Sequence, residues 1–510
     1  MRIVLSWPSG NSKTIPSKLR PSMSETLDLI SQLCQALEAE GVVYCHWKST
    51  AALDRSARGD NDLDLLVSRA DAPRLTEILC RLGFKEARLP PERQLPGVLV
   101  YFGYDRAADK FVQVHAHYQL ILGDDMTKNV RLPIERPFLE SALPGGVFKI
   151  PAPEFEFIVF VIRMVLKYST WDAMLLRQGD LPATARREFE YLEPRVNWTR
   201  LYAVLQEHLP YVGATLFDRC VRCLRPDCPV WTRLQVGRAL YRALHAHTRR
   251  PPFADTCLKL WRRGSRSPRR RIFRHPPRKH MAYGGALIAL VGGDGAGKST
   301  AVDELYTWLS KDFDTIKVHL GKPPRSWVTL VVKGALKMGG WLGAFRKTKV
   351  TVPSGADHRF PGLTGYLQLM WRVARARDRY RAYVKARRFA TNDGYVVCDR
   401  FPLPQVKLMD GARSDQMIDF GRGNRLVEFL VQAEKRYYRQ IMLPELLIVL
   451  RVDPEIAVQR KTDEEAASVR ARSQEIWELD WQQTHAHVID AGRSEAEVLA
   501  ELKSLVWSEL

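Results

Sequence analysis

The stretch Gly292-Gly293-Asp294-Gly295-Ala296-Gly297-Lys298-Ser299-Thr300 decides the fold of the C-terminal half of this chain. The apolar run before it, residues 286–291, predicts a buried strand, and residues 301–309 after it predict a helix. The stretch satisfies the pattern G-x-x-x-x-G-K-[ST], which forms a phosphate-binding loop when it joins a strand to a helix. A glycine-rich turn without function is the simpler alternative, but it leaves the adjoining strand and helix unexplained.

The residue types of this loop suit bound phosphate. Glycines let successive backbone N–H groups turn toward an anion with no Cβ in the way, and the helix dipole adds positive potential there. We expect Lys298 to contact the outer phosphates of ATP and the Ser299 hydroxyl to hold Mg²⁺. The predicted ATP site therefore comprises Gly292, Gly293, Asp294, Gly295, Ala296, Gly297, Lys298, Ser299 and Thr300.

Length and composition indicate more than one domain and no membrane-spanning segment. The chain has 510 residues, enough for two hydrophobic cores. Its most apolar long stretch, residues 327–345, is interrupted by Lys333 and Lys337 and falls short of the ~20 apolar residues that a span needs. Eight scattered cysteines and the lack of a secretory signal favour a cytoplasmic protein with reduced thiols. Residues 1–22 are expected to form a disordered leader.

The net charge of +21 is concentrated in one segment. Residues 249–280 contain twelve lysines and arginines, one acid (Asp255) and several prolines. Because proline breaks a helix interior, we expect no continuous helix here and interpret 249–280 as a basic linker. A solvated connector is the simpler interpretation, and contact with nucleic acid, acidic lipid or another polyanion is the alternative.

Beyond the linker, strands and helices alternate, which is typical of a doubly wound parallel sheet in an α/β domain. The expected strands are 315–320, 395–400, 446–452 and 487–491, and the expected helices are 363–390, 426–440, one beginning at 453–455 and 494–510. Ligands of such sheets bind beyond the carboxyl ends of the strands. The phosphate loop and the pair Asp399-Arg400 both fall at such ends.

Residues 281–510 resemble the thymidylate kinase group of nucleoside monophosphate kinases. The motifs that carry the resemblance are the loop 293–300 with Asp294, the helical segment 376–379, Asp399-Arg400-Phe401 after a strand, the segment 444–460 and the segment 487–491. The resemblance implies a kinase, that is, an ATP- and Mg²⁺-dependent phosphotransferase. It also implies that Arg379 contacts the acceptor nucleotide and that 487–491 closes around the adenine.

The residue types also suit phosphoryl transfer. This reaction requires neutralisation of the negative charge on the phosphate oxygens, a bound metal ion and alignment of the two substrates. Arg400 could clamp the acceptor phosphate, and Asp399 could bind the waters of Mg²⁺. Asp294 is expected to accept a hydrogen bond from an acceptor hydroxyl. For Arg379 and Arg400 an ordinary ion pair is the alternative.

A predicted lid adds further positive charge. It contains Arg460, Lys461, Arg470 and Arg472, for which a solvated helix face is an equally good interpretation. The predicted catalytic residues are therefore Lys298, Asp399, Arg400 and Arg460.

Two departures from the thymidylate kinases concern the acceptor. Residues 319–325 replace the Arg-Glu-Pro-Gly-Gly segment that shapes the acceptor pocket, and the insertion 325–360 has no counterpart. The expected acceptor is thus a nucleotide or another phosphorylated small molecule, in surface-polysaccharide or nucleotide metabolism. The alternative is a non-catalytic ATP-binding switch or scaffold that recruits partners through the linker or the insertion. Homodimer formation is left open.

The N-terminal half carries a second signal, in the segment 59–67. Asp62 and Asp64 are two residues apart on an expected strand, so both point to one face, as carboxylates do when they hold metal ions for nucleotidyl transfer. Residues 23–150 therefore resemble the nucleotidyltransferase fold, an α+β domain. The expected strand 111–120 offers no third acid, so either His115 replaces it or the domain binds without catalysing. An exposed acidic turn is the bland alternative.

A helical extension is expected over 151–248, beginning with the apolar helix 154–167. It contains Cys220, Cys223 and Cys228, whose spacing matches no standard zinc pattern, so packed thiols are favoured over a metal site.

Overall fold

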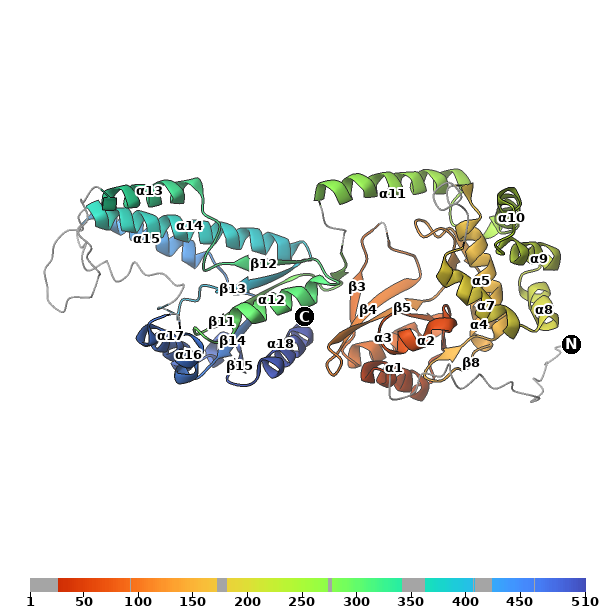
Figure 1. Cartoon of the computed structure of the whole chain (residues 1–510), viewed down its shortest axis with the longest axis horizontal. Coiled ribbons are helices and arrows are strands. Elements are labelled where there is room, and N and C mark those ends of the chain that lie inside the picture. The colour runs from red at the N-terminus through yellow and green to blue at the C-terminus, as the bar shows by residue number, and fades with distance from the viewer. Residues whose placement is uncertain are drawn as a thin grey trace. The chain divides into compact units, whose positions relative to one another are not determined.

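The computed structural model describes residues 26–171, 181–273, 278–341, 363–406, 408 and 424–510, apart from Glu92 and Asp463. The predicted leader 1–22 and residues 342–360 of the insertion 325–360 lie outside these residues. The chain divides into two compact units, Met1–Pro277 and Arg278–Leu510 (Figure 1).

The first unit is built on a mixed sheet whose strands run in the order β1, β2, β5, β4, β3. Strands β2 and β5 are parallel, and the other neighbours are antiparallel. The strands are β1 (Tyr44–His46), β2 (Leu63–Val67), β3 (Lys85–Arg88), β4 (Val98–Asp105) and β5 (Lys110–His117), and the helices of this part are α1 (Asp28–Ala39), α2 (Leu53–Ala57) and α3 (Ala72–Arg81). The single strand expected over 111–120 is shorter than predicted, because β5 ends at His117 and Leu120 begins another strand.

After the strands of the sheet, the chain of the first unit continues mainly as helices. Helix α5 (Pro153–Tyr168) begins with proline in its first turn and is buried on almost every face. Around it lie α7 (Ala183–Leu192), α8 (Trp198–His208), α9 (Gly213–Cys223) and α10 (Val230–Ala243), and shorter elements are β6 (Leu120–Leu122), β7 (Val130–Leu132), α4 (Glu135–Glu140), β8 (Leu143–Pro144) and β9 (Lys149–Ile150). Cys220 and Cys223 are free thiols inside this core, and burial raises the pKa of Cys223 to about 12.

Most of the basic segment is helical, which was not expected from the sequence, although 249–280 as a whole is not one continuous helix. Helix α11 spans Pro252–Phe273. Pro252 lies in its first turn, where the missing N–H costs nothing, and only Pro268 falls in its interior. Part of the segment also packs on its own unit: Arg263 pairs with Asp124 at 3.2 Å, and Asp255 is buried. These contacts attach part of the segment to the first unit, whereas most residues of 251–264 are exposed.

The second unit contains a fully parallel sheet in the order β12, β13, β11, β14, β15. Every residue of β11 is buried, as expected for a parallel sheet covered on both faces. Its strands are β11 (Ala286–Gly292), β12 (Thr315–His319), β13 (Tyr395–Asp399), β14 (Leu446–Arg451) and β15 (His487–Asp490), and the short strand β10 (His280–Met281) is not part of this sheet. This is the parallel α/β sheet that the sequence predicts.

Helices surround this sheet, and among them α13 and α15 pack on α14 (Figure 1). They are α12 (Lys298–Ser310), α13 (Trp327–Trp341), α14 (Leu363–Thr391), α15 (Arg425–Arg439), α16 (Pro454–Arg460), α17 (Ala466–Glu478) and α18 (Glu495–Glu509). Two predicted helix starts are present: the Asp453 side chain caps α16, and Ser494 with Glu497 forms a capping box on α18. No helix among the described residues is long and apolar enough to cross a membrane.

Candidate functional site

The phosphate loop joins β11 to α12 at the carboxyl edge of the parallel sheet. Its backbone requires glycine at Gly295, where φ is +75° and an added Cβ would lie 2.8 Å from the Ala457 carbonyl oxygen. At Gly293 an added Cβ would lie 2.6 Å from Ser473 Oγ. The glycines therefore allow helices α16 and α17 to approach the loop closely.

Lys298 begins helix α12 and is buried within the loop. Its ammonium group donates a hydrogen bond to the Gly293 carbonyl, so the side chain bends back over the loop. Ser299 and Thr300 are exposed on the first turn of the same helix. The positive charge of Lys298 and the N-terminal N–H groups of α12 thus lie together, as an anion site requires.

Asp294 is held by two arginines. Its side chain is only 3% exposed, its Oδ2 lies 2.7 Å from Arg472 Nη1, and its Oδ1 lies 3.9 Å from Arg400 Nη2. Ser473 Oγ also donates to the Asp294 carbonyl at 3.2 Å. Helix α17 is therefore tied to the phosphate loop. The sequence placed Arg472 in a group of lid cations without indicating this partner.

Asp399 is the last residue of β13 and lies opposite Leu290 of β11 and His319 of β12. It is buried, with its Oδ2 3.6 Å from His319 Nε2. Among the described residues no hydrogen-bond partner meets its Oδ1. A buried carboxylate oxygen without a partner suits a hard cation such as Mg²⁺ or the water bound to it, and the Ser299 hydroxyl is the same type of ligand.

Arg400 follows Asp399 in the left-handed region, with φ of +56°, so strand β13 ends one residue earlier than predicted. A non-glycine residue rarely adopts this conformation, and such strain is typical of functional sites. The side chain packs against Gly321, where an added Cβ would lie 2.8 Å from Arg400 Cδ. Its side chain is about one-third exposed, more than those of Asp294 and Asp399.

Arg379 lies on α14, and its hydrogen bonds to other parts of the second unit favour a positioning role. Its Nε donates to the Leu320 carbonyl at 2.7 Å, its Nη2 to the Gly321 carbonyl at 3.3 Å, and its Nη1 to the Tyr438 hydroxyl. The neighbouring Asp378 accepts from Thr329 Oγ1 at 2.6 Å. Both residues therefore fix the segment after β12. The predicted contact of Arg379 with an acceptor nucleotide stays a prediction.

A cavity of about 270 Å³ lies beside the phosphate loop. Arg460 is on its wall, and its Nη1 donates to the Ala491 carbonyl at 2.8 Å, which joins α16 to the segment after β15. The lining residues are Gly295, Ala296, Gly297, Thr300, Ala301, Arg460, Ala491, Arg493, Glu495, Val498 and Leu499. The other lid cations have acidic partners: Arg470 pairs with Glu455, and Lys461 with Glu464.

In the first unit, Asp64 lies at the centre of a group of charged and imidazole side chains. Its Oδ1 is 2.8 Å from Lys48 Nζ and 3.2 Å from both His115 Nδ1 and His117 Nε2. Although burial raises the pKa of Asp64, Lys48 and the two histidines hold it well below its usual range. Asp62 is half-exposed, with Oδ2 3.8 Å from His115 Nδ1. Asp62 and Asp64, the predicted metal-binding pair, therefore both lie within 4 Å of His115 Nδ1. Lys48, from a different strand end, was missed.

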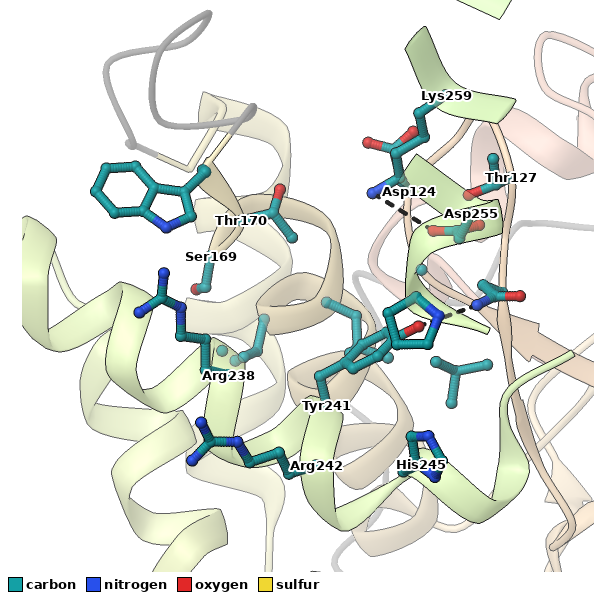
Figure 2. A pocket seen from close by; sticks show the side chains of 18 of the residues that line it. Asp124, Thr127, Ser169, Thr170, Arg238, Tyr241, Arg242, His245, Asp255 and Lys259 are labelled. Atoms are coloured by element: carbon teal, nitrogen blue, oxygen red, sulfur yellow. Dashed lines mark hydrogen bonds and ion pairs between the residues drawn. The ribbon is translucent and has the colours of Figure 1, made fainter. Parts of the chain in front are cut away.

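The first unit also contains a cavity of about 650 Å³ (Figure 2). Arg238, Arg242 and His245 lie on one side of it, and Asp124 and Asp255 lie on the other, with Lys259 paired to Asp255 at 3.8 Å. Two of the lining residues are joined directly, because Asn129 Nδ2 donates to the Tyr241 hydroxyl at 3.0 Å. No motif in the sequence indicated this cavity, because its walls come from segments that are far apart in the chain.

Two proteins of Escherichia coli strain K12 are similar to part of this chain. The uncharacterized ATP-binding protein YghR is 28% identical over 228 residues, which cover 43% of this chain and 86% of YghR. The uncharacterized ATP-binding protein YghS is 27% identical over 194 residues, which cover 36% of this chain and 77% of YghS. No protein-family model matches the chain. These proteins are distant homologues of part of the chain.

Proposed function

We propose that residues 278–510 bind ATP with Mg²⁺ and transfer its γ-phosphoryl group to a small-molecule acceptor. The observation that carries the proposal is the placement of two groups at neighbouring strand ends. Lys298 is buried in a glycine-rich loop after β11, and the buried Asp399 ends the adjacent strand β13. A cation for phosphate oxygens and an acid for a metal are the parts that phosphoryl transfer needs. The names of YghR and YghS, ATP-binding proteins, agree with ATP as the donor.

The donor would lie along the loop with its phosphates on the backbone N–H groups and on Lys298. The cavity between the loop and residues 491–499 would then take the adenosine, in accord with the resemblance of 487–491 to an adenine-binding segment. Arg460 already holds the wall of that cavity through Ala491. In this proposal Arg460 shapes the nucleotide site, and it would contact the phosphates only after breaking its hydrogen bond to the Ala491 carbonyl.

Ser299 and Asp399 would hold Mg²⁺ at the outer phosphates. When bound, the ion would neutralise the negative charge that develops on the phosphate oxygens during transfer. Lys298 would shift from the Gly293 carbonyl to the phosphate oxygens, a better partner for an ammonium group. Catalysis would then depend on the alignment of the two substrates and on the stabilisation of charge, and no covalent bond to the protein would form.

Arg400 would bind the phosphate of the acceptor. It is partly exposed, comes directly after Asp399 and has a forked guanidinium group suited to two phosphate oxygens. Asp294, 3.9 Å from this group, would orient it, while its predicted bond to an acceptor hydroxyl stays a prediction. The acceptor is a nucleotide or another phosphorylated small molecule. Thymidylate itself is not proposed, because residues 319–325 differ from the usual acceptor segment.

A second candidate function is an ATP-dependent switch without transfer. The observation that favours it is the ion pair of Arg472 with Asp294, which connects the loop that would bind ATP to helix α17. Binding of ATP at the loop would then change the position of α17, and a partner would detect it.

Two measurements separate these functions. Isothermal titration with ATP and Mg²⁺ tests the donor site, and ADP formation with a panel of nucleoside monophosphates and sugar phosphates tests transfer. A kinase should form ADP only when an acceptor of one chemical class is present. ATP binding without ADP from any acceptor would favour the switch, and no ATP binding would contradict both.

For the first unit we propose a nucleotidyltransferase-like domain over 23–150 with a helical extension over 151–248. The mixed sheet with Asp62 and Asp64 beside His115 supports this proposal. A polyanion contact in the segment 249–280 and a cytoplasmic location stay predictions.

A further inference from the structure

Asp64, His115 and His117 bring one carboxylate oxygen and two imidazole nitrogens to one point of the first unit. These three atoms all lie within 4.8 Å of one another, and Asp64 Oδ1 is 3.2 Å from each of the two nitrogens. In a tetrahedral site with metal–ligand bonds of about 2.0–2.1 Å, neighbouring ligand atoms are about 3.3 Å apart. The oxygen–nitrogen distances already match that value.

The sheet creates this arrangement. His115 and His117 alternate with buried valine and alanine on β5, so both imidazoles lie on the same face. Strand β2 pairs with β5 in a register that places Asp64 opposite His115. The indole of Trp47 packs edge-on against the His117 ring at 5.1 Å and limits its rotation. Backbone pairing and packing therefore fix the three groups before any ion arrives.

The ligand types select the class of ion. Mg²⁺ prefers oxygen ligands and several waters, whereas imidazole nitrogen suits Zn²⁺, Co²⁺ and related transition metals. We propose that Asp64, His115 and His117 form a site for one transition-metal dication, with a fourth position open to water or to Asp62, whose Oδ2 is 3.8 Å from His115 Nδ1. This differs from a magnesium pair held by Asp62 and Asp64.

Lys48 gives the site a built-in competitor. Its ammonium group lies 2.8 Å from Asp64 Oδ1, the oxygen that would bind the metal. A metal ion and the ammonium cannot both occupy this place, so metal binding requires Lys48 to turn away. The Lys48 side chain is about one-fifth exposed and can reach water. Removal of its charge should therefore strengthen metal binding, although it removes a partner of the buried Asp64.

His115 has an outer partner that fixes the orientation of its ring. The Gln113 side-chain amide meets His115 Nε2 and leaves Nδ1 facing Asp64 and Asp62. Histidine ligands of metals commonly make such a second hydrogen bond, which fixes the ring and the nitrogen that faces the ion. The atom that contacts Nε2 is the amide nitrogen of Gln113. When Nδ1 binds a metal and Nε2 carries the proton, the amide would have to turn over so that its oxygen accepts from Nε2–H.

The test is a titration of the full-length, chelator-treated protein with Co²⁺, followed by visible absorption. Wild type should show saturable bands of one four- or five-coordinate ion, and Zn²⁺ should abolish them. The bands should be lost in His115→Ala and in Asp64→Asn. Lys48→Met should bind Co²⁺ about tenfold more tightly than wild type. Circular dichroism of each variant checks that it folds.

The matched control is Lys110→Met. Lys110 lies on the same sheet and also pairs with an aspartate, Asp60, at 2.9 Å, but this pair is outside the cluster. Its Co²⁺ affinity should equal that of wild type. If Asp64→Asn does not fold, His115→Ala and Lys48→Met still decide the question.

Three outcomes would overturn the proposal. Bands that persist unchanged in His115→Ala would place the ion elsewhere among the twelve histidines and eight cysteines. A lack of binding in both wild type and Lys48→Met would reduce the cluster to an ion pair. Displacement of Co²⁺ by equimolar Mg²⁺ would contradict the metal class. None of these results depends on phosphoryl transfer by the second unit.

Discussion

The guanidinium group of Arg472 lies 2.7 Å from the buried carboxylate of Asp294, so helix α17 is joined to the phosphate loop by an ion pair. Arg470 is two residues away on the same helix and pairs with the exposed Glu455 at 2.7 Å. The two pairs have the same chemistry and nearly the same N–O distance. They differ in burial, and burial decides how much the loss of one partner costs.

Arg472→Ala should destabilise the second unit by about 2 kcal/mol, somewhat below the ~3–5 kcal/mol typical of breaking a fully buried pair, because Arg472 is one-quarter exposed. Arg470→Ala is the control and should leave stability unchanged. Urea unfolding of the full chain, with hydrogen exchange of peptides from 278–510 as the readout, measures the effect of both substitutions. Equal effects of the two substitutions would contradict the special role of Asp294.

Lys298→Ala should lower the rate of phosphoryl transfer by at least ~100-fold, because the variant loses a positive charge aimed at the transferring phosphate. The control is Lys311→Ala at the exposed end of the same helix, which should retain full activity. ADP formation at saturating ATP measures the rate, and circular dichroism checks the fold. A well-folded Lys298→Ala protein with unchanged turnover would rule out the kinase proposal.

Arg400→Ala should weaken binding of the acceptor about tenfold or more and change ATP affinity little, because the forked contact to the acceptor phosphate is lost. Arg400→Lys keeps the charge but not the fork, so it should recover only part of the affinity. Titration calorimetry with each substrate in turn gives the two affinities. A drop confined to ATP would assign Arg400 to the donor site instead.

Acid should destabilise the first unit through His46. This side chain is 1% exposed, and burial lowers its pKa to about 4 from 6.5. Between those pH values the unfolded chain binds a proton that the folded chain refuses, so stability is lost as pH falls from 6.5 to 4. The His46 contribution to that loss is about 3 kcal/mol, at 1.36 kcal/mol per pKa unit. His46→Leu should therefore lose less stability over this range than wild type.

Glu156 provides a comparison of opposite sign. Burial raises its pKa to about 7, so the folded chain keeps a proton that the unfolded chain releases above pH 4.5. Its contribution to stability is present at low pH and is lost as pH rises from 4.5 to 7. Glu156→Gln should remove that dependence. Urea unfolding at several pH values, monitored in peptides from 26–171, separates the two slopes, and parallel curves for wild type and both variants would contradict the assignment.

Local patterns in the sequence were sufficient for most of the second unit. The run 286–291 is apolar without interruption, short and followed at once by a glycine-rich loop, which is typical of a strand covered on both faces, so β11 was predictable. The start of α16 was equally local, because Asp453 and Pro454 cap and begin a helix by themselves. Helix α11 shows the limit of such reasoning. Its prolines argued against a helix, but one of them occupies the first turn, and contacts with the rest of the first unit compensate for their cost.

The sequence by itself determined the phosphate loop, the parallel sheet and the residue types at its carboxyl edge, because periodicity and glycine spacing act over a few neighbouring residues. Only the tertiary structure decided which charges meet. Asp294 and Arg472 are 178 positions apart in the numbering, and Lys48 reaches Asp64 from a different strand end. Strand register and helix packing set these distances. The strength of an ion pair or a metal site changes when the distance between its atoms changes by a few tenths of an ångström. The partners of the predicted residues could therefore be identified only in the folded chain.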